Sequence, residues 1–407
     1  IGDIMFNKFN NLGKKIRTEE EEKKDDTKKV SATPTSDKEK ARKQLLKLVA
    51  IISGGFVVIL LIVLIGTAVI GTDHSYDQIE QILKNAAIKY YQVQDVLLPS
   101  KEGETSEVDA TTLASDDYKL MKPLAKLKKN ASCTGKVVVQ KINNKFIYTP
   151  YLDCGDSYKT EELYKAVINE NKPVTSGNGL YEMNGEHVFR GDTVNNYVKL
   201  SKGLFRIVKI TSENKILLIP EFNNNYYDVW DDRYNSDISY SAGINAYRPS
   251  RMKDILANVY AGKEKELILL DDTDKQKLTT FPLCIGKRSQ EEVNNTGAIE
   301  CADVLDNQII GLLTVSDYLN ASLDTNCTKT VSKSCQNYNY LKIKDITWWL
   351  ASATNANTSD VYYVNQEGYI LTSNASSLNI VRPTIMLNNN VMIRSGKGTE
   401  SDPFILK

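Results

Sequence analysis

Histidine is the rarest residue in this 407-residue chain, with only two copies, His74 and His187. Histidine is the usual general base beside a nucleophilic serine or cysteine. With only two histidines in the chain, a histidine-dependent catalytic triad is not expected. The chain also has no C-x-x-C pair, and the shortage of both ligand types argues against a zinc site. These absences favour a non-catalytic protein, and no catalytic residue or cofactor is assigned.

An excess of one charge sign is also missing, because 51 Lys and Arg residues balance 51 Asp and Glu residues. Nucleic-acid-binding domains usually carry a strong basic excess, so nucleic acid is not an expected partner. Within residues 1–47, the stretches EEEEKKDDTKK and SATPTSDKEK are charged and almost free of apolar residues. Such a segment buries too little surface to offset chain entropy, so residues 1–47 are expected to be disordered.

One long apolar run follows this tail. Residues 48–72, LVAIISGGFVVILLIVLIGTAVIGT, carry no charge. A helix of that length covers about 37 Å, enough to cross a hydrocarbon core of about 30 Å. Basic residues precede the run and Asp73 follows it, which predicts a single-pass membrane protein with a cytoplasmic N-terminus and an extracellular bulk. A cleaved signal peptide is the alternative, but its apolar region is usually shorter and closer to the N-terminus.

All six cysteines follow the apolar run, in a compartment where disulfides persist. Six cysteines allow 15 pairings. Proximity in the sequence favours Cys133 with Cys154, Cys284 with Cys301, and Cys327 with Cys335. In the loop-entropy description, each closure stabilises the fold by about 2.5–3.5 kcal/mol.

Residues 73–171 have the pattern of a small proximal α+β domain. Ser75 and Gln78 match a capping box, and the apolar residues after them recur at helical spacing, which predicts a helix over residues 76–93. The polar stretch 99–112 is expected to be a loop. Two alternating segments between the first two cysteines then predict a disulfide-stapled hairpin that turns at Asn143-Asn144.

A membrane helix, an amphipathic helix, a small sheet and a late disulfide loop together resemble type IV pilins over residues 48–160. Prepilins are cleaved between a Gly and an aromatic residue and carry Glu at the fifth mature position. Gly55-Phe56 matches the cleavage pattern, whereas Leu60 stands where Glu is expected. The resemblance is one of domain architecture and implies a stalk-like proximal domain or a pilin-like subunit.

Residues 172–407 have the pattern of a distal mixed domain. Short apolar runs between residues 188 and 221 predict a meander of strands. Pro249 is expected at the first position of a helix that Gly262 terminates. Three shorter elements are also predicted: a helix over residues 272–278, a helix over 316–322 capped by Ser316, and a hairpin turning at 366–368.

Seven ordered motifs over residues 181–407 carry a family resemblance: GLFRIV, WDDRYN, GLLTVSDYLNAS, WWLAS, YYVNQEG, VRPTIML and GKGTESDPFIL. Together they resemble an uncharacterised family of surface domains from Gram-positive-type bacteria. That family is similar to the C-type-lectin-like and formylglycine-generating-enzyme fold, which implies a compact mixed domain with many loops. Ala351 stands where relatives usually have Arg. The expected fold class is therefore α+β: one transmembrane helix, a stalk domain and a distal lectin-like domain.

Aromatic and charged residues of these motifs are candidates for ligand binding. Trp348 and Trp349 are adjacent in an expected strand, so one is predicted to fill the core and the other to meet a neighbouring element or solvent. A core role for most of the aromatic residues is the alternative. Arg382 is expected to form a buried or partly buried ion pair. The candidate set is Trp230, Asp231, Asp232, Arg233, Trp348, Trp349, Tyr363 and Arg382.

Asp231 and Asp232 are the candidates for metal binding. They are adjacent, so in an extended strand the two carboxylates would point to opposite faces. A structural role is expected for them, either in capping a loop or in pairing with Arg233. Calcium is the alternative ligand, but it takes six to eight oxygen atoms and the sequence shows no regular ligand spacing.

These features predict a membrane-anchored bacterial surface protein whose distal domain binds a surface glycan or protein partner without catalysis, for example in adhesion. Two other hypotheses stay open. One is a structural pilin-like or envelope-complex subunit, which includes a homo-oligomer. The other is a metal-dependent hydrolase of cell-wall glycans, with Asp231 and Asp232 as ligands. The sequence identifies neither the ligand nor the oligomeric state.

Overall fold

The computed structural model describes residues 73–407, except 130–131, 143, 156, 202, 222–225, 239 and 264–269. The described part is a mixed α+β structure with more strand than helix. The predicted cytoplasmic tail and membrane span, residues 1–72, lie outside the described residues. Within the part that is described, no helix combines the length and apolar character that a membrane crossing needs.

Two separate hydrophobic cores organise the described residues. The first draws its buried residues from Ile79 to Tyr158, and the second from Leu163 to Phe404. Along the chain, the first core ends and the second begins before residue 171, where the domain boundary was expected. The reason is helix α6 (Leu163–Glu170), whose buried residues all belong to the second core.

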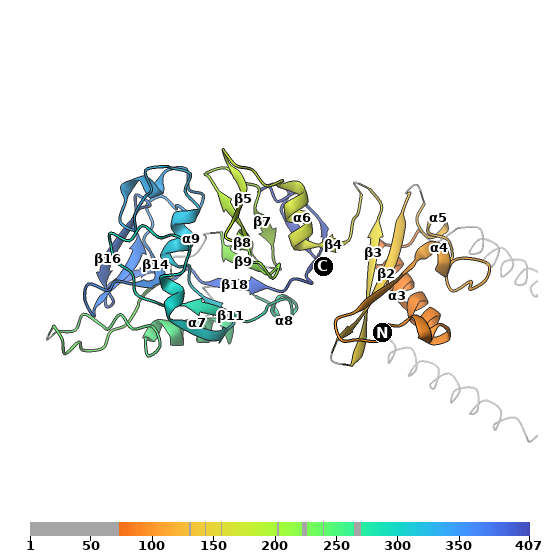
Figure 1. Ribbon diagram of the computed structural model, residues 1–407, viewed down its shortest axis with the longest axis horizontal. Helices are drawn as coiled ribbons and strands as arrows, with labels where there is room; N and C mark the ends of the chain where they lie inside the picture. The colour runs from red at the N-terminus through yellow and green to blue at the C-terminus, as the bar shows by residue number, and fades with distance from the viewer. Residues whose placement is uncertain are drawn as a thin grey trace, which may run out of the picture. The chain divides into compact units, whose positions relative to one another are not determined.

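Helix α3 (Tyr76–Val93) is central to the first core, and its bounds match the predicted helix. The Ser75 hydroxyl accepts a hydrogen bond from the Gln78 N–H at 3.2 Å, and the Gln78 side chain accepts one from the Ser75 N–H at 2.9 Å. Both halves of the capping box are therefore present. The apolar stripe of α3 lies against a three-stranded sheet of order β1-β2-β3 (Figure 1).

The hairpin of this sheet confirms the sequence prediction. Strands β2 (Thr134–Ile142) and β3 (Lys145–Asp153) pair antiparallel along their whole length. Asn144 takes a φ of 58° at the turn, and the disulfide Cys133–Cys154 closes the open end. The expected loop over 99–112 is wrong in part, because β1 (Thr105–Asp109) pairs with β2 and α4 (Ala110–Leu113) follows. As an edge strand, β1 buries only Val108, so its sequence shows no apolar alternation.

The larger sheet of the second core has the strand order β13-β18-β9-β8-β7-β20-β19-β4, and β5 and β6 join it through β8. Its strands are β4 (Glu161–Glu162), β5 (Gly179–Met183), β6 (Glu186–Arg190), β7 (Tyr197–Lys199), β8 (Leu204–Ile210), β9 (Ile216–Pro220), β13 (Ile310–Gly311), β18 (Thr384–Leu387), β19 (Met392–Ser395) and β20 (Phe404–Leu406). The predicted meander corresponds to β6 through β9. Strands from the end of the chain complete the sheet on both sides of it (Figure 1).

A smaller sheet of order β10-β17-β14-β15-β16 and a two-stranded sheet of β11 and β12 complete the second core. Their strands are β10 (Tyr227–Val229), β11 (Phe281–Cys284), β12 (Val304–Gln308), β14 (Trp348–Ala353), β15 (Asp360–Val364), β16 (Ile370–Asn374) and β17 (Leu378–Ile380). The hairpin of β15 and β16 turns where predicted, with Gly368 at a φ of 89°.

Two helix starts in the second core differ from the prediction. Ser250 caps α7 (Arg251–Tyr260), so Pro249 precedes the cap instead of opening the helix. Thr314 caps α9 (Val315–Asn320) in a capping box with Asp317, so Ser316 lies inside the helix. The other short helices are α5 (Leu124–Leu127), α8 (Asp272–Lys275), η1 (Asp95–Leu97), η2 (Glu300–Ala302) and η3 (Lys333–Gln336).

Candidate functional site

The three tryptophans of the predicted ligand-binding set are core residues. Trp230, Trp348 and Trp349 are each 0% exposed. Trp230 and Trp349 meet edge to face with ring centroids 6.0 Å apart, and Trp349 donates a hydrogen bond to the Asp228 carbonyl at 3.0 Å. Strand β14 is central in its sheet and buried on both faces, so neither of its tryptophans reaches solvent. Tyr363 is only partly buried and packs against Trp349.

Asp231 has a structural role. Its carboxylate accepts hydrogen bonds from Arg233 Nε at 2.9 Å and from the backbone N–H groups of Arg233, Ile244 and Arg251 at 3.1 to 3.3 Å. It therefore ties its own loop to the start of α7 and pairs with Arg233, as the structural reading of the sequence expects. Asp232 is exposed and lies 3.7 Å from Arg251. Among the described residues, no group of three or more His, Cys, Asp or Glu side chains is placed to hold a metal ion.

Arg382 is buried, at 3% exposure, and among the described residues its guanidinium meets backbone carbonyl oxygens where an ion pair was expected. Its guanidinium donates to the carbonyl oxygens of Pro220, at 3.1 and 3.3 Å, and of Leu341, at 3.2 Å. It also lies over the Trp348 ring, 5.2 Å from the centroid. Burial lowers the pKa of Arg382 to about 10. Arg382 thus joins segments of the core, and the eight predicted residues do not form one accessible surface.

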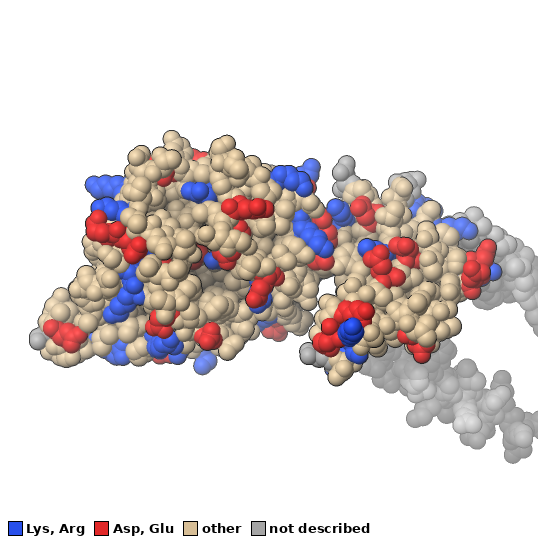
Figure 2. Space-filling view, in the orientation of Figure 1, with Lys and Arg blue, Asp and Glu red and all other residues tan. Residues whose placement is uncertain are grey.

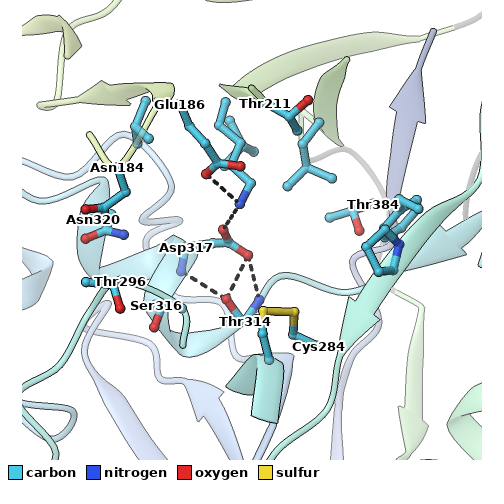
Figure 3. Close-up of a pocket in the computed structure, with 18 of the residues that line it drawn as sticks. Asn184, Glu186, Thr211, Cys284, Thr296, Thr314, Ser316, Asp317, Asn320 and Thr384 are labelled. Carbon is cyan, nitrogen blue, oxygen red and sulfur yellow. Dashed lines mark hydrogen bonds and ion pairs between the residues drawn. A yellow bond between two sulfur atoms is a disulfide. The ribbon is translucent and has the colours of Figure 1, made fainter. Parts of the chain in front are cut away.

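A pocket of about 330 Å³ opens elsewhere in the second core, among β6, β8, β9, β11, β18 and α9 (Figure 3). This volume is at the lower end of the range of about 300–1,000 Å³ that is usual for small-molecule sites. Buried apolar side chains form much of its wall: Val188, Val208, Leu217, Leu283, Leu312 and Met386. The pocket is the best candidate site of the described residues.

The charged groups of the pocket form a chain of ion pairs. The Lys209 ammonium lies 3.1 Å from Glu186 Oε2 and 3.3 Å from Asp317 Oδ1. The other oxygen of Asp317 accepts hydrogen bonds from the Thr314 N–H at 3.1 Å and from the Thr314 hydroxyl at 2.8 Å (Figure 3). The Asp317 carboxylate therefore both caps α9 and pairs with Lys209. The Lys209 ammonium is thus held between two carboxylates, those of Asp317 and Glu186.

A β-bulge explains how Lys209 comes to face the pocket. Adjacent residues of a regular strand point to opposite faces. The pairing of β8 with β9 shifts register between Ile207 and Lys209, and both Val208 and Lys209 line the pocket. An extra residue of this kind bends a strand and re-aims its side chains. The local irregularity thus places the Lys209 side chain in the pocket beside the buried Val208.

Lys209 keeps its proton over the physiological pH range. Burial lowers the pKa of Lys209, but the charges of Asp317 and Glu186 raise it more, and the pKa ends above its usual value. A lysine acts as a nucleophile or general base only after it loses its proton. Lys209 is therefore suited to binding and not to nucleophilic chemistry.

The Thr384 hydroxyl is a second polar feature of the pocket. Thr384 is 0% exposed and lines the pocket, and its Oγ1 has no hydrogen-bond partner among the described residues. Buried hydroxyls normally find a partner, because leaving one unsatisfied costs about 1–3 kcal/mol. Figure 3 shows Thr384 on the side of the pocket opposite Asn184 and Asn320.

The rim of the pocket is braced by a disulfide and a buried ion pair. Cys284 and Cys301 are bonded to each other and both line the pocket. The loop between them carries both members of the Arg288–Glu300 pair, which is 0% exposed and has an N···O distance of 3.0 Å. Glu300 also accepts from the backbone N–H and the hydroxyl of Ser316, next to Asp317 on α9. The buried pair thereby fixes the loop to the helix that holds Lys209.

Several residues of the pocket lie in or next to three motifs of the family resemblance, although sequence reasoning named none of them as a binding residue. The segment GLLTVSDYLNAS supplies Thr314, Ser316 and Asp317; VRPTIML supplies Thr384; and Lys209 directly follows GLFRIV. A single lysine inside an apolar strand and an aspartate three residues after a threonine were the available signals. Neither signal shows that the two side chains meet.

The charges of the described surface are mixed. On the face that Figure 2 shows, basic and acidic side chains are interspersed. Comparison of the chain with known protein families, with curated proteins and with solved structures finds no match.

Proposed function

We propose that this chain is a membrane-anchored surface protein that binds a ligand or partner without catalysis. In this proposal, residues 48–72 cross the membrane with the N-terminus inside, and the distal domain is C-type-lectin-like. The motif resemblance and the uncharged run support these two points. The three disulfides, Cys133–Cys154, Cys284–Cys301 and Cys327–Cys335, indicate an extracellular or secreted protein.

The observation that carries the binding function is the pocket of Glu186, Lys209 and Asp317. Its charged groups are fixed by one another and by the α9 cap, and its rim is closed by a disulfide. Groups held in this way bind without an ordering cost, which is the general advantage of a preorganised site. A fixed lysine that stays protonated fits recognition better than group transfer.

The binding function is tested with the full-length chain in mild detergent on an array of glycans and peptides. We expect selective capture that is lost in Thr296→Trp, because Thr296 is an exposed residue of the pocket rim and an indole there fills the opening. Thr328→Trp, at an exposed position that does not line the pocket, is the matched control and should bind as the wild type does. Equal capture by both variants would contradict the proposed site.

The anchored topology has its own test. Protease added to intact cells should cleave the part of the chain after Asp73 and leave the part before residue 48 intact. Protection of the later part would contradict an extracellular location. Six free thiols in the isolated protein would contradict it as well.

A further inference from the structure

We infer that the pocket takes a primary ammonium group carried on an apolar body, the chemistry of a peptide amino terminus whose first side chain is apolar. The inference rests on the proposed binding function and names the class of its ligand. Three features of the pocket carry it: the balance of charge, an unpartnered hydroxyl and the apolar wall.

The balance of charge selects a cation. Glu186, Lys209 and Asp317 are the only charged side chains among the described residues that line the pocket, so its formal charge is −1. The single cation, Lys209, is already held by both carboxylates, at 3.1 and 3.3 Å. An anionic ligand would compete with two carboxylates for the Lys209 ammonium and would be repelled by them. An ammonium ligand could instead pair with a carboxylate that accepts a second partner.

Glu186 is the carboxylate that is open to a ligand. Its side chain is 30% exposed, whereas that of Asp317 is 14% exposed and is committed to the α9 cap. A carboxylate has about four acceptor positions, and an ammonium uses one or two of them. Hydrogen bonds between ionised groups are roughly twice as strong as neutral ones, so this contact would provide most of the polar affinity.

The Thr384 hydroxyl indicates that the ligand carries a second polar group. It is fully buried in the lining of the pocket, and none of the described residues forms a hydrogen bond with it. A ligand with a carbonyl or an N–H beyond its ammonium group would satisfy this hydroxyl, and a peptide amino terminus carries both. The apolar wall of Val188, Leu283 and Met386 then accommodates an apolar side chain.

The experiment uses the full-length chain in mild detergent and measures affinity by calorimetry. The probes are L-leucinamide, its N-acetyl derivative and hexylamine. Leucinamide should bind, and N-acetyl-leucinamide, which has no charge, should bind at least about tenfold more weakly. Affinity for leucinamide should fall as pH rises above about 8, where an α-amino group loses its proton. Binding of leucinamide but not hexylamine assigns the site to peptide termini, and equal binding of both assigns it to amines in general.

Three variants locate the contact. Glu186→Gln should weaken leucinamide binding about tenfold or more, and Thr384→Val, which keeps the shape of the side chain, by about two- to tenfold. Glu291→Gln is the matched control, because Glu291 also pairs with a lysine, Lys329, but lies outside the pocket. Its affinity should not change.

Two results would overturn the inference: no binding of leucinamide, or leucinamide binding that neither N-acetylation nor Glu186→Gln weakens. Either result leaves the proposed binding function separately testable. Capture on the glycan and peptide array that Thr296→Trp abolishes would show that the pocket binds a ligand of another charge class. Absence of any selective capture by the wild-type chain on the array would refute the binding function itself.

Discussion

Replacing Glu300 with glutamine should destabilise the protein by about 3–5 kcal/mol, the usual cost of breaking a buried ion pair by removing one partner. Glu300 and Arg288 are both 0% exposed, so the remaining Arg288 charge would stay buried without a counter-charge. The amide would also place a donor against groups that now donate to Glu300, namely Arg288 Nη1 and the N–H of Ser316.

The matched control lies in the same loop. Glu291 pairs with Lys329 at 2.6 Å, but its side chain is 74% exposed. Exposed pairs contribute between about 0 and 1 kcal/mol, so Glu291→Gln should be close to neutral. The two substitutions make the same chemical change and differ in burial.

Urea unfolding followed by tryptophan fluorescence suits the measurement, because all three tryptophans are buried in the second core. The double variant Arg288→Met/Glu300→Met should lose less stability than the sum of its two single variants, since it leaves no unpaired charge. A loss below about 1 kcal/mol for Glu300→Gln, or strict additivity in the double variant, would refute the argument from burial.

Thr314→Ala should cost about 0.5–2 kcal/mol in the same urea assay, because it removes the cap of α9; an unchanged midpoint would mean that the cap is dispensable. Lys209→Met should reveal the pH dependence of the pocket ion pairs. The pKa of Lys209 is raised in the folded state, so its contribution is present below the ordinary lysine pKa of about 10.4 and is lost as pH rises through the raised value. The stability difference between wild type and Lys209→Met should therefore stay constant from about pH 7 to 9 and shrink above about pH 10.5, and a difference that grows there would contradict the sign of the shift. Replacing Cys133 and Cys154 together with serine should cost about 3 kcal/mol, as expected for closing a loop with a sequence separation of 21; a loss below about 1 kcal/mol would show that the hairpin holds its register without the bond.

Local sequence was enough for helix α3 and the β2–β3 hairpin of the first core. The α3 helix begins at its capping box and follows its apolar stripe, both of which depend on neighbours within a few residues. The β2–β3 hairpin could also be predicted from the sequence, because a short turn and two flanking cysteines fix its register. Edge strand β1 was missed, since a strand that buries one residue leaves no periodic signal.

The candidate binding residues were chosen by amino-acid type. The type of a residue does not determine whether its side chain is exposed to solvent. Trp348 and Trp349 were candidates for ligand binding, but the central position of β14 buries both of its faces. Arg382 looked like half of an ion pair, but backbone carbonyl oxygens from Pro220 and Leu341 lie within reach of it instead. Partners from distant segments decided both outcomes.

By itself the sequence predicted the cysteine pairing, the mixed α+β class, helix α3 and the turns of the two hairpins, because these depend on short spacings along the chain. Only the tertiary structure decided where the pocket lies. Glu186, Lys209 and Asp317 are brought together by the pairing of β6 with β8, a bulge in β8 and the docking of α9. The physical reason is that an ion pair needs two groups a few ångströms apart in space, and their separation in sequence does not limit this distance.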